Sequence, residues 1–353
     1  MLAAVMRGPG DLTPTSIPTP SPAPGELLVA VGANTICGTD LRILRGEKTA
    51  GVKLPVVLGH ETAGQVAAVG AGVTGYEVGE PVVAAPMIPC RRCWECRHDL
   101  DNLCRNPRIL GYGIDGGMAE YVLVPADAVE AGCLIVADEE LPFEQLALTE
   151  PLSACVAGQK RSPVEPDDVV LVMGAGPIGL FHVQLARLAG AREVVVSEPV
   201  AARRAHAERL GATVSIDPRG DDLAAAVDEV SNGVGVDSAI LCIGIPELLN
   251  QALQLSRSGG RVNVFAGFKG CGLSEIEANL IHYKQVQLTG SANARRADFE
   301  IAIRLIESGR IDSASMITHR FGVQDVLDAL GVVGHGDAIK VAVMPGRSNT
   351  PQR

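Results

Sequence analysis

The stretch DVVLVMGAGPIGLFHVQLARLAG, residues 168–190, decides the fold. It contains five apolar residues in succession, typical of a strand that is buried on both faces of a parallel sheet. Its second half, PIGLFHVQLARLAG, has the apolar spacing of an amphipathic helix. The two halves meet at a G-x-G-x-x-G turn, Gly174 to Gly179. The stretch therefore predicts strand, glycine turn and helix, the unit that α/β folds repeat.

The alternation of predicted strand and predicted helix continues toward the C-terminus. Predicted strands EVVVSE, TVSID and DSAILCIG are followed by predicted helices VAARRAHAERLGA, DDLAAAVDEVSNG and PELLNQALQLSRSG. Two further strands, RVNVFAG and VQLTGS, come after them. Short apolar strands that alternate with amphipathic helices predict a doubly wound parallel sheet.

The glycine turn also predicts a binding site. A turn that follows a strand and opens a helix directs backbone N–H groups and the positive helix end at a pyrophosphate. Glu198 ends the next strand, where a carboxylate accepts hydrogen bonds from ribose hydroxyls and repels a 2′-phosphate. The pattern thus favours NAD. Arg203 is able to pair with a 2′-phosphate, which keeps NADP as an alternative.

The chain before residue 165 has a different sequence pattern. Short β segments broken by Gly and Pro occur at 25–31, 64–79, 80–86 and 119–125. This spacing predicts a β-rich, barrel-like unit. After Ser291 a predicted helix, ADFEIAIRLIESG, and a predicted strand, AIKVAVMP, complete the chain.

Composition excludes several functions. The chain has 353 residues, 47% of them hydrophobic, and a net charge of −11. It has no basic stripe, so nucleic acid and anionic membranes are not expected partners. The N-terminus does not resemble a signal peptide and no apolar window of about 20 residues follows. We therefore expect a cytoplasmic protein.

Four of the nine cysteines lie within fifteen residues, at Cys90, Cys93, Cys96 and Cys104. In a reducing compartment such thiols are more often metal ligands or catalytic groups than disulfide partners. Four thiolates that close a tetrahedron predict a structural zinc site in a lobe at 88–106. An iron–sulfur cluster and four unrelated thiols are the alternatives. Metal binding would supply folding free energy that this loop lacks.

A further group of candidate site residues is spread along the chain: Cys37, His60, Glu61 and Glu150. Thiolate, imidazole and carboxylate all bind zinc, and three protein ligands with one open position make a catalytic site. Taken singly, each residue also has a structural interpretation as a buried thiol, a loop histidine or a charge at a helix start. Their spacing alone does not join them.

Together these stretches resemble the medium-chain, zinc-dependent alcohol dehydrogenase superfamily, in its polyol, sugar and threonine dehydrogenase branch. The matching motifs are ICGTD, GHE, the four-cysteine lobe, DGGMAEY, EPL, GAGPIG and HYKQVQLTGS, in the family's order. The resemblance implies a chaperonin-like β-barrel catalytic domain, residues 1–155 and 292–353. A Rossmann NAD-binding domain, residues 156–291, would be inserted between them.

The resemblance also implies the roles of site residues. Cys37, His60 and Glu61 would hold one catalytic zinc, with Glu150 as a ligand that exchanges with water. Thr39 would carry the proton away from the alcohol while hydride passes to NAD. Arg42 stands where many relatives have histidine, which weakens the threonine interpretation, because arginine cannot cycle a proton at neutral pH.

The cofactor contacts implied in the same way are Gly174, Gly176, Pro177, Ile178, Gly179, Glu198, Arg203, Cys242, Ile243, Gly244, Phe265, Ala266, Ser291, Ala292 and Asn293. The expected substrate is a polyol, sugar or aminocyclitol, with a ring alcohol of an aminoglycoside as the most specific prediction. L-Threonine 3-dehydrogenase, a general secondary alcohol dehydrogenase and a nucleotide-sensing protein on the same fold are the alternatives. A homotetramer or homodimer is expected.

Overall fold

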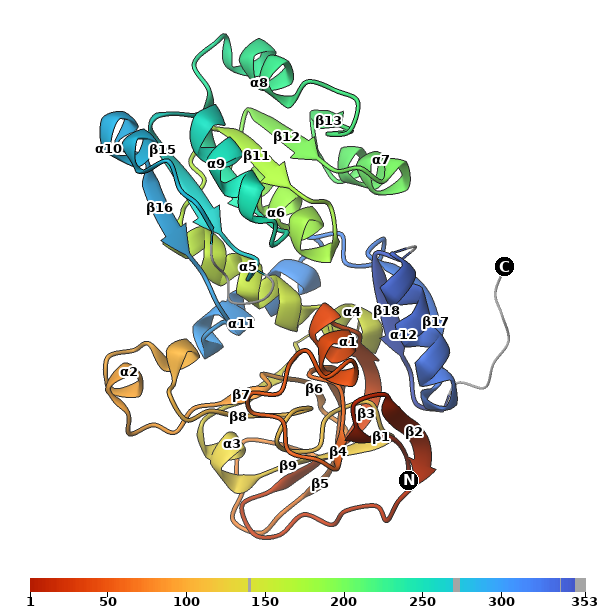
Figure 1. The fold of residues 1–353 in the computed structure, drawn as a ribbon. Coiled ribbons are helices and arrows are strands. Elements are labelled where there is room, and N and C mark those ends of the chain that lie inside the picture. Colours follow the sequence, from red (N-terminus) through yellow and green to blue (C-terminus); the bar gives the residue numbers. More distant parts are fainter. Residues whose placement is uncertain (139–140, 269–273, 337, 347–353) are drawn as a thin grey trace. The chain divides into compact units, whose positions relative to one another are not determined.

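The computed structural model describes residues 1–138, 141–268, 274–336 and 338–346 (Figure 1). The chain divides into two compact units. Unit 1 contains residues 1–153 and 295–353, and unit 2 contains residues 154–294. Both ends of the chain contribute to unit 1, because strand β18 (Lys340–Val343) pairs with β3 (Leu27–Thr35).

The main sheet of unit 1 has the strand order β10-β6-β5-β3-β18-β17, and β9 also pairs with β3. Its other strands are β5 (Glu61–Val69), β6 (Pro81–Ala84), β9 (Tyr121–Val124), β10 (Leu134–Val136) and β17 (Ile317–Phe321). In the antiparallel register of β3 and β5, Thr35 lies opposite Glu61. In the antiparallel register of β18 and β3, Ala342 lies opposite Thr35. The register therefore brings the first residue of β5 close to the start of β18.

Smaller elements complete unit 1. A three-stranded sheet has the order β2-β1-β4, and β7 pairs with β8. These strands and the helices of the unit are β1 (Leu2–Gly8), β2 (Asp11–Ser16), α1 (Gly38–Leu44), β4 (Val56–Val57), β7 (Met87–Ile88), α2 (Trp94–Arg97), η1 (Asp101–Leu103), β8 (Arg108–Ile109), α3 (Ala126–Glu130), α4 (Phe143–Leu146), α11 (Arg296–Glu307), η2 (Val323–Asp325) and α12 (Val326–His335). The core of the unit includes Met6, Leu58, Met118 and Val341, so the C-terminal segment packs with the N-terminal strands.

Unit 2 is one parallel six-stranded sheet in the order β13-β12-β11-β14-β15-β16, and its helices alternate with its strands along the chain (Figure 1). Its elements are β11 (Val169–Met173), α6 (Pro177–Leu188), β12 (Glu193–Ser197), α7 (Ala201–Arg209), β13 (Val214–Ile216), α8 (Leu223–Ser231), β14 (Val236–Leu241), α9 (Pro246–Leu255), β15 (Ser256–Val264), α10 (Ala278–Lys284) and β16 (Gln287–Gly290). Helix α5 (Thr149–Arg161) spans the division between the units. The predicted α/β fold with a doubly wound parallel sheet is confirmed.

One predicted β segment is shorter than expected. We expected β structure through residues 64–79, but β5 ends at Val69. Beyond it Gly72, Gly75 and Gly79 all have positive φ, between 82° and 96°. Such values suit turns and not a strand, and glycine adopts them without strain.

Within the residues described above, no helix is both long enough and apolar enough to cross a membrane.

Candidate functional site

The four thiols of the predicted lobe come together. Their sulfur atoms all lie within 4.8 Å of one another. Cys93 Sγ is 3.4 Å from Cys96 Sγ and 3.9 Å from Cys104 Sγ. Four thiolates at about 2.3 Å from one zinc ion stand roughly 3.8 Å apart in a tetrahedron. The cluster therefore fits a four-thiolate metal site.

The protonation of these thiols agrees with a site that needs a cation. Hydrogen bonds from the backbone of Arg92 and Cys93 lower the pKa of Cys90 to about 6. Loss of water around Cys96 raises the pKa of that thiol to about 12, and burial also raises the pKa of Cys104. Sulfurs this close cannot all ionise alone, because their negative charges repel one another. A bound dication removes that repulsion.

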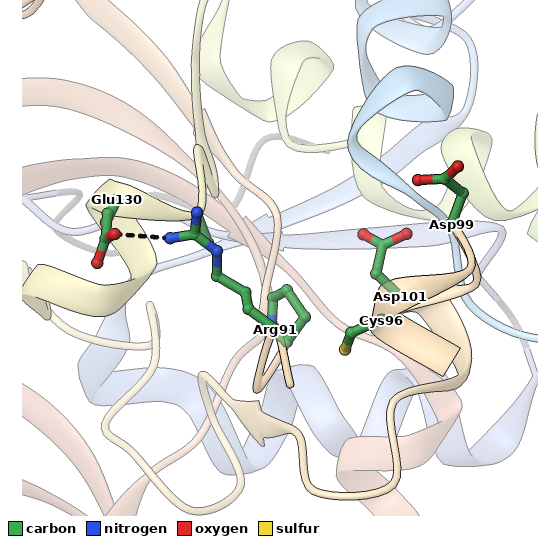
Figure 2. Close-up of a pocket in the computed structure, with 7 residues that line it drawn as sticks. Arg91, Cys96, Asp99, Asp101 and Glu130 are labelled. Carbon is green, nitrogen blue, oxygen red and sulfur yellow. Dashed lines mark ion pairs between the residues drawn. The ribbon is translucent and has the colours of Figure 1, made fainter. Parts of the chain in front are cut away.

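A pocket of about 320 Å³ lies beside this lobe. Figure 2 shows the Arg91 side chain reaching toward Glu130, with Cys96 among the lining side chains. Arg91 Nη1 lies 2.9 Å from Glu130 Oε1. Asp99 and Asp101 also line the pocket. The candidate catalytic residues belong to other parts of unit 1, so we assign this pocket no catalytic role.

The second cluster contains Cys37, His60 and Glu61, whose ligand atoms also lie within 4.8 Å of one another. Cys37 precedes α1, and His60 and Glu61 stand at the start of β5. His60 and Glu61 are 5% and 1% exposed. The structure thus joins three of the four residues that spacing alone could not join.

The fourth residue, Glu150, is not in this set of ligand atoms. It lies at the start of α5, and its carboxyl feels the charges of His60 and Glu61. Burial, together with the negative charge of Glu61, raises the pKa of Glu150 to about 7, against an opposing effect of His60.

The His60 imidazole is held by a buried carboxylate. Asp40 Oδ1 lies 3.2 Å from His60 Nδ1, and Asp40 Oδ2 accepts a hydrogen bond from the Cys37 backbone N–H at 2.9 Å. Burial alone would lower the pKa of His60, but the Asp40 charge raises it well above its ordinary value. Asp40 therefore links two of the candidate ligands. Sequence reasoning missed it, although its position three residues after Cys37 at the start of a helix is a local signal.

The Glu61 carboxylate is held by an ammonium. Lys340 Nζ lies 2.6 Å from Oε1 and 2.6 Å from Oε2, and the Thr35 hydroxyl donates a hydrogen bond to Oε2. Both Lys340 and Thr35 are buried. Sequence reasoning missed these partners, and 279 residues separate Lys340 from Glu61.

Thr39 and Arg42 lie on α1, the helix that follows Cys37. Thr39 Oγ1 lies 3.6 Å from Cys37 Sγ, which puts the hydroxyl beside the candidate ligands. Arg42 is exposed near the C-terminus of the same helix. Tyr112, which sequence reasoning did not single out, packs edge-on against His60 with 5.4 Å between ring centroids.

In unit 2 the predicted glycine turn joins β11 to α6. Gly174 has φ +98°, and a Cβ on Gly179 would lie 1.9 Å from the Gly174 carbonyl oxygen. Gly176 caps the twelve-residue helix α6, and a Cβ there would meet no atom within 4 Å. Pro177 and Ile178 open the helix. The turn thus leaves space at a helix N-terminus, where a phosphate binds favourably.

Glu198 follows β12 and reaches this turn. Its Oε2 accepts a hydrogen bond from the Ala175 N–H at 2.8 Å, and its Oε1 accepts one from the Val200 N–H at 2.9 Å. Each oxygen keeps further acceptor capacity for a ribose hydroxyl. Arg203 lies on α7, while its neighbour Arg204 donates to the Glu198 carbonyl oxygen at 2.7 Å.

The remaining predicted cofactor residues follow the ends of β14, β15 and β16. Ile243 lies near Gly174, since a Cβ on Gly174 would be 3.5 Å from Ile243 Cβ. Ser291 Oγ donates to Asn263 Oδ1 at 3.1 Å. The others follow the same strand ends: Cys242, Gly244, Phe265, Ala266, Ala292 and Asn293. Because the carboxyl ends of parallel strands share one edge, this set lies on the side where α/β sheets bind ligands.

Comparison with known proteins gives consistent matches. Residues 23–132 match the alcohol dehydrogenase GroES-like domain, and residues 177–308 match the zinc-binding dehydrogenase family. An L-threonine 3-dehydrogenase of Pyrococcus horikoshii is 34% identical over 349 residues, 98% of each chain. A D-arabitol-phosphate dehydrogenase of Enterococcus avium is 32% identical, covering 92% of this chain and 91% of its own. A Sinorhizobium meliloti crystal structure bound to NADP has a TM-score of 0.91 and 34% identity, covering 98% of this chain and 99% of its own.

Proposed function

Because the chain belongs to the zinc-binding alcohol dehydrogenase family, we propose that it oxidises a secondary alcohol to a ketone with transfer of hydride to NAD+. The observation that carries this proposal is the buried cluster of Cys37, His60 and Glu61, whose ligand atoms lie within 4.8 Å of one another. A thiolate, an imidazole and a carboxylate are the donor set of a zinc site that keeps one position open.

Cys37, His60 and Glu61 would hold the catalytic zinc, and Cys90, Cys93, Cys96 and Cys104 a structural one. When bound, the catalytic zinc polarises the alcohol oxygen and NAD+ accepts the hydride. Asp40 orients His60 so that the nitrogen facing away from Asp40 is available to the metal.

Side chains near the cluster of Cys37, His60 and Glu61 would remove the alcohol proton. We assign the Thr39 hydroxyl, beside Cys37, to relay the alcohol proton: its oxygen accepts that proton while its own hydroxyl proton passes to the next acceptor. Arg42 is exposed and permanently charged, so it does not carry the proton onward. The Glu150 carboxyl, at the start of α5, lies close enough to feel the charges of His60 and Glu61. Glu150 is therefore our choice for the next acceptor.

For the cofactor we propose NAD rather than NADP. The Glu198 carboxylate faces the glycine turn and would repel a 2′-phosphate while accepting from ribose hydroxyls. The Sinorhizobium meliloti relative was solved with NADP, so the two cofactors need direct comparison. Arg203 and Arg204 are the groups that would favour NADP.

For the substrate we propose a polyol or sugar, because carboxylates beside the donor set make a polar site. The arabitol-phosphate dehydrogenase relative supports a polyhydroxylated substrate. The prediction of an aminocyclitol or aminoglycoside ring alcohol rests on composition and net charge alone.

L-Threonine is the second candidate, and Lys48 favours it. Lys48 Nζ stands 5.8 Å from the centroid of the Tyr112 ring, which itself packs against His60. Lys48 Nζ also donates a hydrogen bond to the Ala50 carbonyl oxygen at 2.9 Å, and an ammonium beside the Tyr112 ring attracts a substrate carboxylate. The Pyrococcus relative that acts on threonine supports the same reading.

The test is NADH or NADPH formation with sorbitol, myo-inositol, L-threonine and an aminoglycoside that has a free ring hydroxyl. Turnover of sorbitol or inositol supports a polyol substrate, and no turnover of any of the four contradicts the proposed activity. If threonine is the substrate, Lys48→Met raises its KM and leaves turnover of a neutral alcohol unchanged. Lys53→Met, at an exposed lysine in the same loop, is the matched control.

A further inference from the structure

The carboxyl ends of β12 and β13 lie side by side in unit 2. Ser197 lies opposite Ile216 in the parallel register, and the Glu198 N–H donates to the Ile216 carbonyl oxygen at 3.1 Å. Glu198 and Asp217 are the residues that follow these two strands. Asp217 therefore lies at the same sheet edge as Glu198, the residue assigned to the ribose hydroxyls.

Two guanidinium groups hold the backbone at this edge. Arg204 Nη1 donates to the carbonyl oxygens of Glu198 and Pro199, at 2.7 Å and 3.0 Å. Arg219 Nη2 donates to the same Pro199 carbonyl oxygen. Guanidinium groups bind phosphate through several N–H donors at once. A 2′-phosphate on a ribose held by Glu198 would therefore meet two cations of the kind that recognise it.

Asp217 binds both of these guanidinium groups. Its Oδ1 accepts from Arg219 Nε at 2.9 Å and its Oδ2 accepts from Arg219 Nη2 at 2.7 Å, which makes a two-point contact. The Arg219 backbone N–H also donates to Oδ1, at 3.1 Å, and Arg204 Nη1 lies 3.4 Å from Oδ2. A carboxylate has about four acceptor positions, two on each oxygen. These contacts fill them, so Asp217 is not itself placed to bind a ribose hydroxyl.

We propose that Asp217 is a cofactor-selecting residue: it binds the two guanidinium groups that a 2′-phosphate would otherwise recruit, and so it reinforces the preference for NAD. This inference rests on the proposed function, because it requires a dinucleotide at the glycine turn. Its physical basis is competition between anions. A 2′-phosphate would have to displace the Asp217 carboxylate from Arg204 and Arg219, and it would meet a second negative charge in addition to Glu198.

Replacing Asp217 with asparagine changes its charge and hardly changes its shape. The amide oxygen still accepts the Arg219 backbone N–H, whereas the ionic attraction that holds both guanidinium groups is lost. Arg204 keeps the carbonyl oxygens of Glu198 and Pro199 as partners, so the segment after β12 should keep its conformation. The expected gain in affinity is therefore confined to ligands that carry a 2′-phosphate.

The experiment compares NADPH with NADH, which differ only in the 2′-phosphate. Binding of each to the full-length chain is measured by calorimetry without an alcohol, so turnover plays no part. In Asp217→Asn the affinity for NADPH should increase on the order of fivefold, and the affinity for NADH should stay within about twofold. The gain should shrink at high salt, because the new contacts are ionic. Asp217→Glu, which keeps the charge, should keep the native affinities.

Asp167→Asn is the matched control. Asp167 Oδ2 lies 3.9 Å from Arg192 Nη1 and its side chain is 80% exposed, so this change also removes one paired negative charge from unit 2. Asp167 precedes β11, at the opposite end of that strand from the glycine turn, and its replacement should leave both affinities unchanged. Arg219→Met in the Asp217→Asn chain is the second variant, and it should cancel a large part of the gain.

Melting temperature shows whether each variant is folded, and Asp217→Ser replaces Asp217→Asn if the latter does not fold. Unchanged or weaker NADPH binding in the folded variant overturns the inference and leaves the proposed function standing. An equal gain for NADH and NADPH also overturns it, as does a gain that Arg219→Met does not reduce. Failure of the native chain to bind either dinucleotide overturns the inference together with the proposed activity.

Discussion

The lobe around Cys90 to Cys104 and the cluster around Cys37 both gather ligand atoms within 4.8 Å, but they are built in different ways. The lobe takes all its ligands from fifteen consecutive residues, and only Cys104 among them is buried. The Cys37 cluster takes its ligands from two segments and its supporting charges from α1 and from β18 at the other end of the chain.

The difference suits the role proposed for each cluster. A closed site needs four ligands and little else, because the metal itself organises the loop. A site with an open position must remain shaped when ligands exchange, so its carboxylate and imidazole need partners of their own. Lys340 and Asp40 supply those partners at the Cys37 cluster.

The largest expected effect comes from Cys37→Ser. It should lower turnover by roughly three orders of magnitude or more and remove one of two zinc ions, because the open site loses a fixed ligand. NAD binding should be unchanged. Turnover, zinc content and NAD titration check this. Cys133→Ser, at a buried thiol outside both clusters, should keep both ions and full activity. Native turnover in Cys37→Ser would remove the distinction between the two clusters.

Cys93→Ser tests the other side of the comparison. It should remove the structural ion and lower the melting temperature by roughly 10 °C, because the lobe depends on its metal for folding. Trp94 is the only tryptophan, is 56% exposed, and stacks on His98 with 4.2 Å between ring centroids. Its fluorescence therefore reports directly on the lobe. A folded lobe without the ion would contradict the structural role.

The dinucleotide turn, like the lobe, is built from local sequence, and Glu198→Ser tests its preference. Replacing the carboxylate removes the repulsion of a 2′-phosphate, so the ratio of kcat/KM for NAD+ to that for NADP+ should fall on the order of tenfold or more. Steady-state kinetics with both cofactors measure it. Glu193→Gln, at the other end of β12, is the control and should leave the ratio unchanged. An unchanged ratio in Glu198→Ser would mean that Glu198 does not select the cofactor.

The smallest effect concerns two buried histidines. His60 Nδ1 lies 3.2 Å from the charged Asp40 carboxylate, whereas burial is the only influence on the pKa of the His182 imidazole among the described residues. Burial lowers the pKa of His182 to about 3, while its value in the unfolded chain is about 6.5. The unfolded state thus binds more protons below pH 6.5, and stability falls as the pH falls.

His182→Leu should remove that dependence. At pH 5 the native chain should lose about 2 kcal/mol relative to pH 7 through His182, and the variant should lose correspondingly less. Denaturant unfolding of both proteins at the two pH values measures the difference. His282→Leu, at an exposed position in unit 2, should retain the native pH dependence. Equal slopes in native chain and His182→Leu would show that His182 is protonated or hydrated in the folded state.

The fold was predictable where one local pattern decides the element. Continuous apolar runs predicted the strands of unit 2, and the family resemblance predicted the membership that the comparisons confirm. Strands β1 and β2 were not predicted; β1 pairs with β2 across a short turn and with β4 about fifty residues further along the chain. The glycine-rich segment after Val69 was predicted wrongly, since its glycines serve turns.

The candidate sites also divide into those that a local sequence pattern predicts and those that it does not. The four-thiol lobe was predictable because its ligands are close in sequence. Cys37, His60 and Glu61 were joined only by resemblance, and Lys340 not at all. Lys340 is an ordinary residue of an apolar terminal strand, and only the pairing of β18 with β3 brings it to Glu61.

The most direct measurement removes zinc from the full-length chain in steps with a chelator, while zinc content, NADH formation and Trp94 fluorescence are followed together. The account predicts two zinc ions per chain. Activity should disappear with the first ion while Trp94 emission stays constant, because the open site holds its metal less tightly than four thiolates do. Trp94 emission should change only with the second ion. A single ion whose loss ends activity and changes Trp94 emission together, or activity that survives loss of both ions, would contradict it.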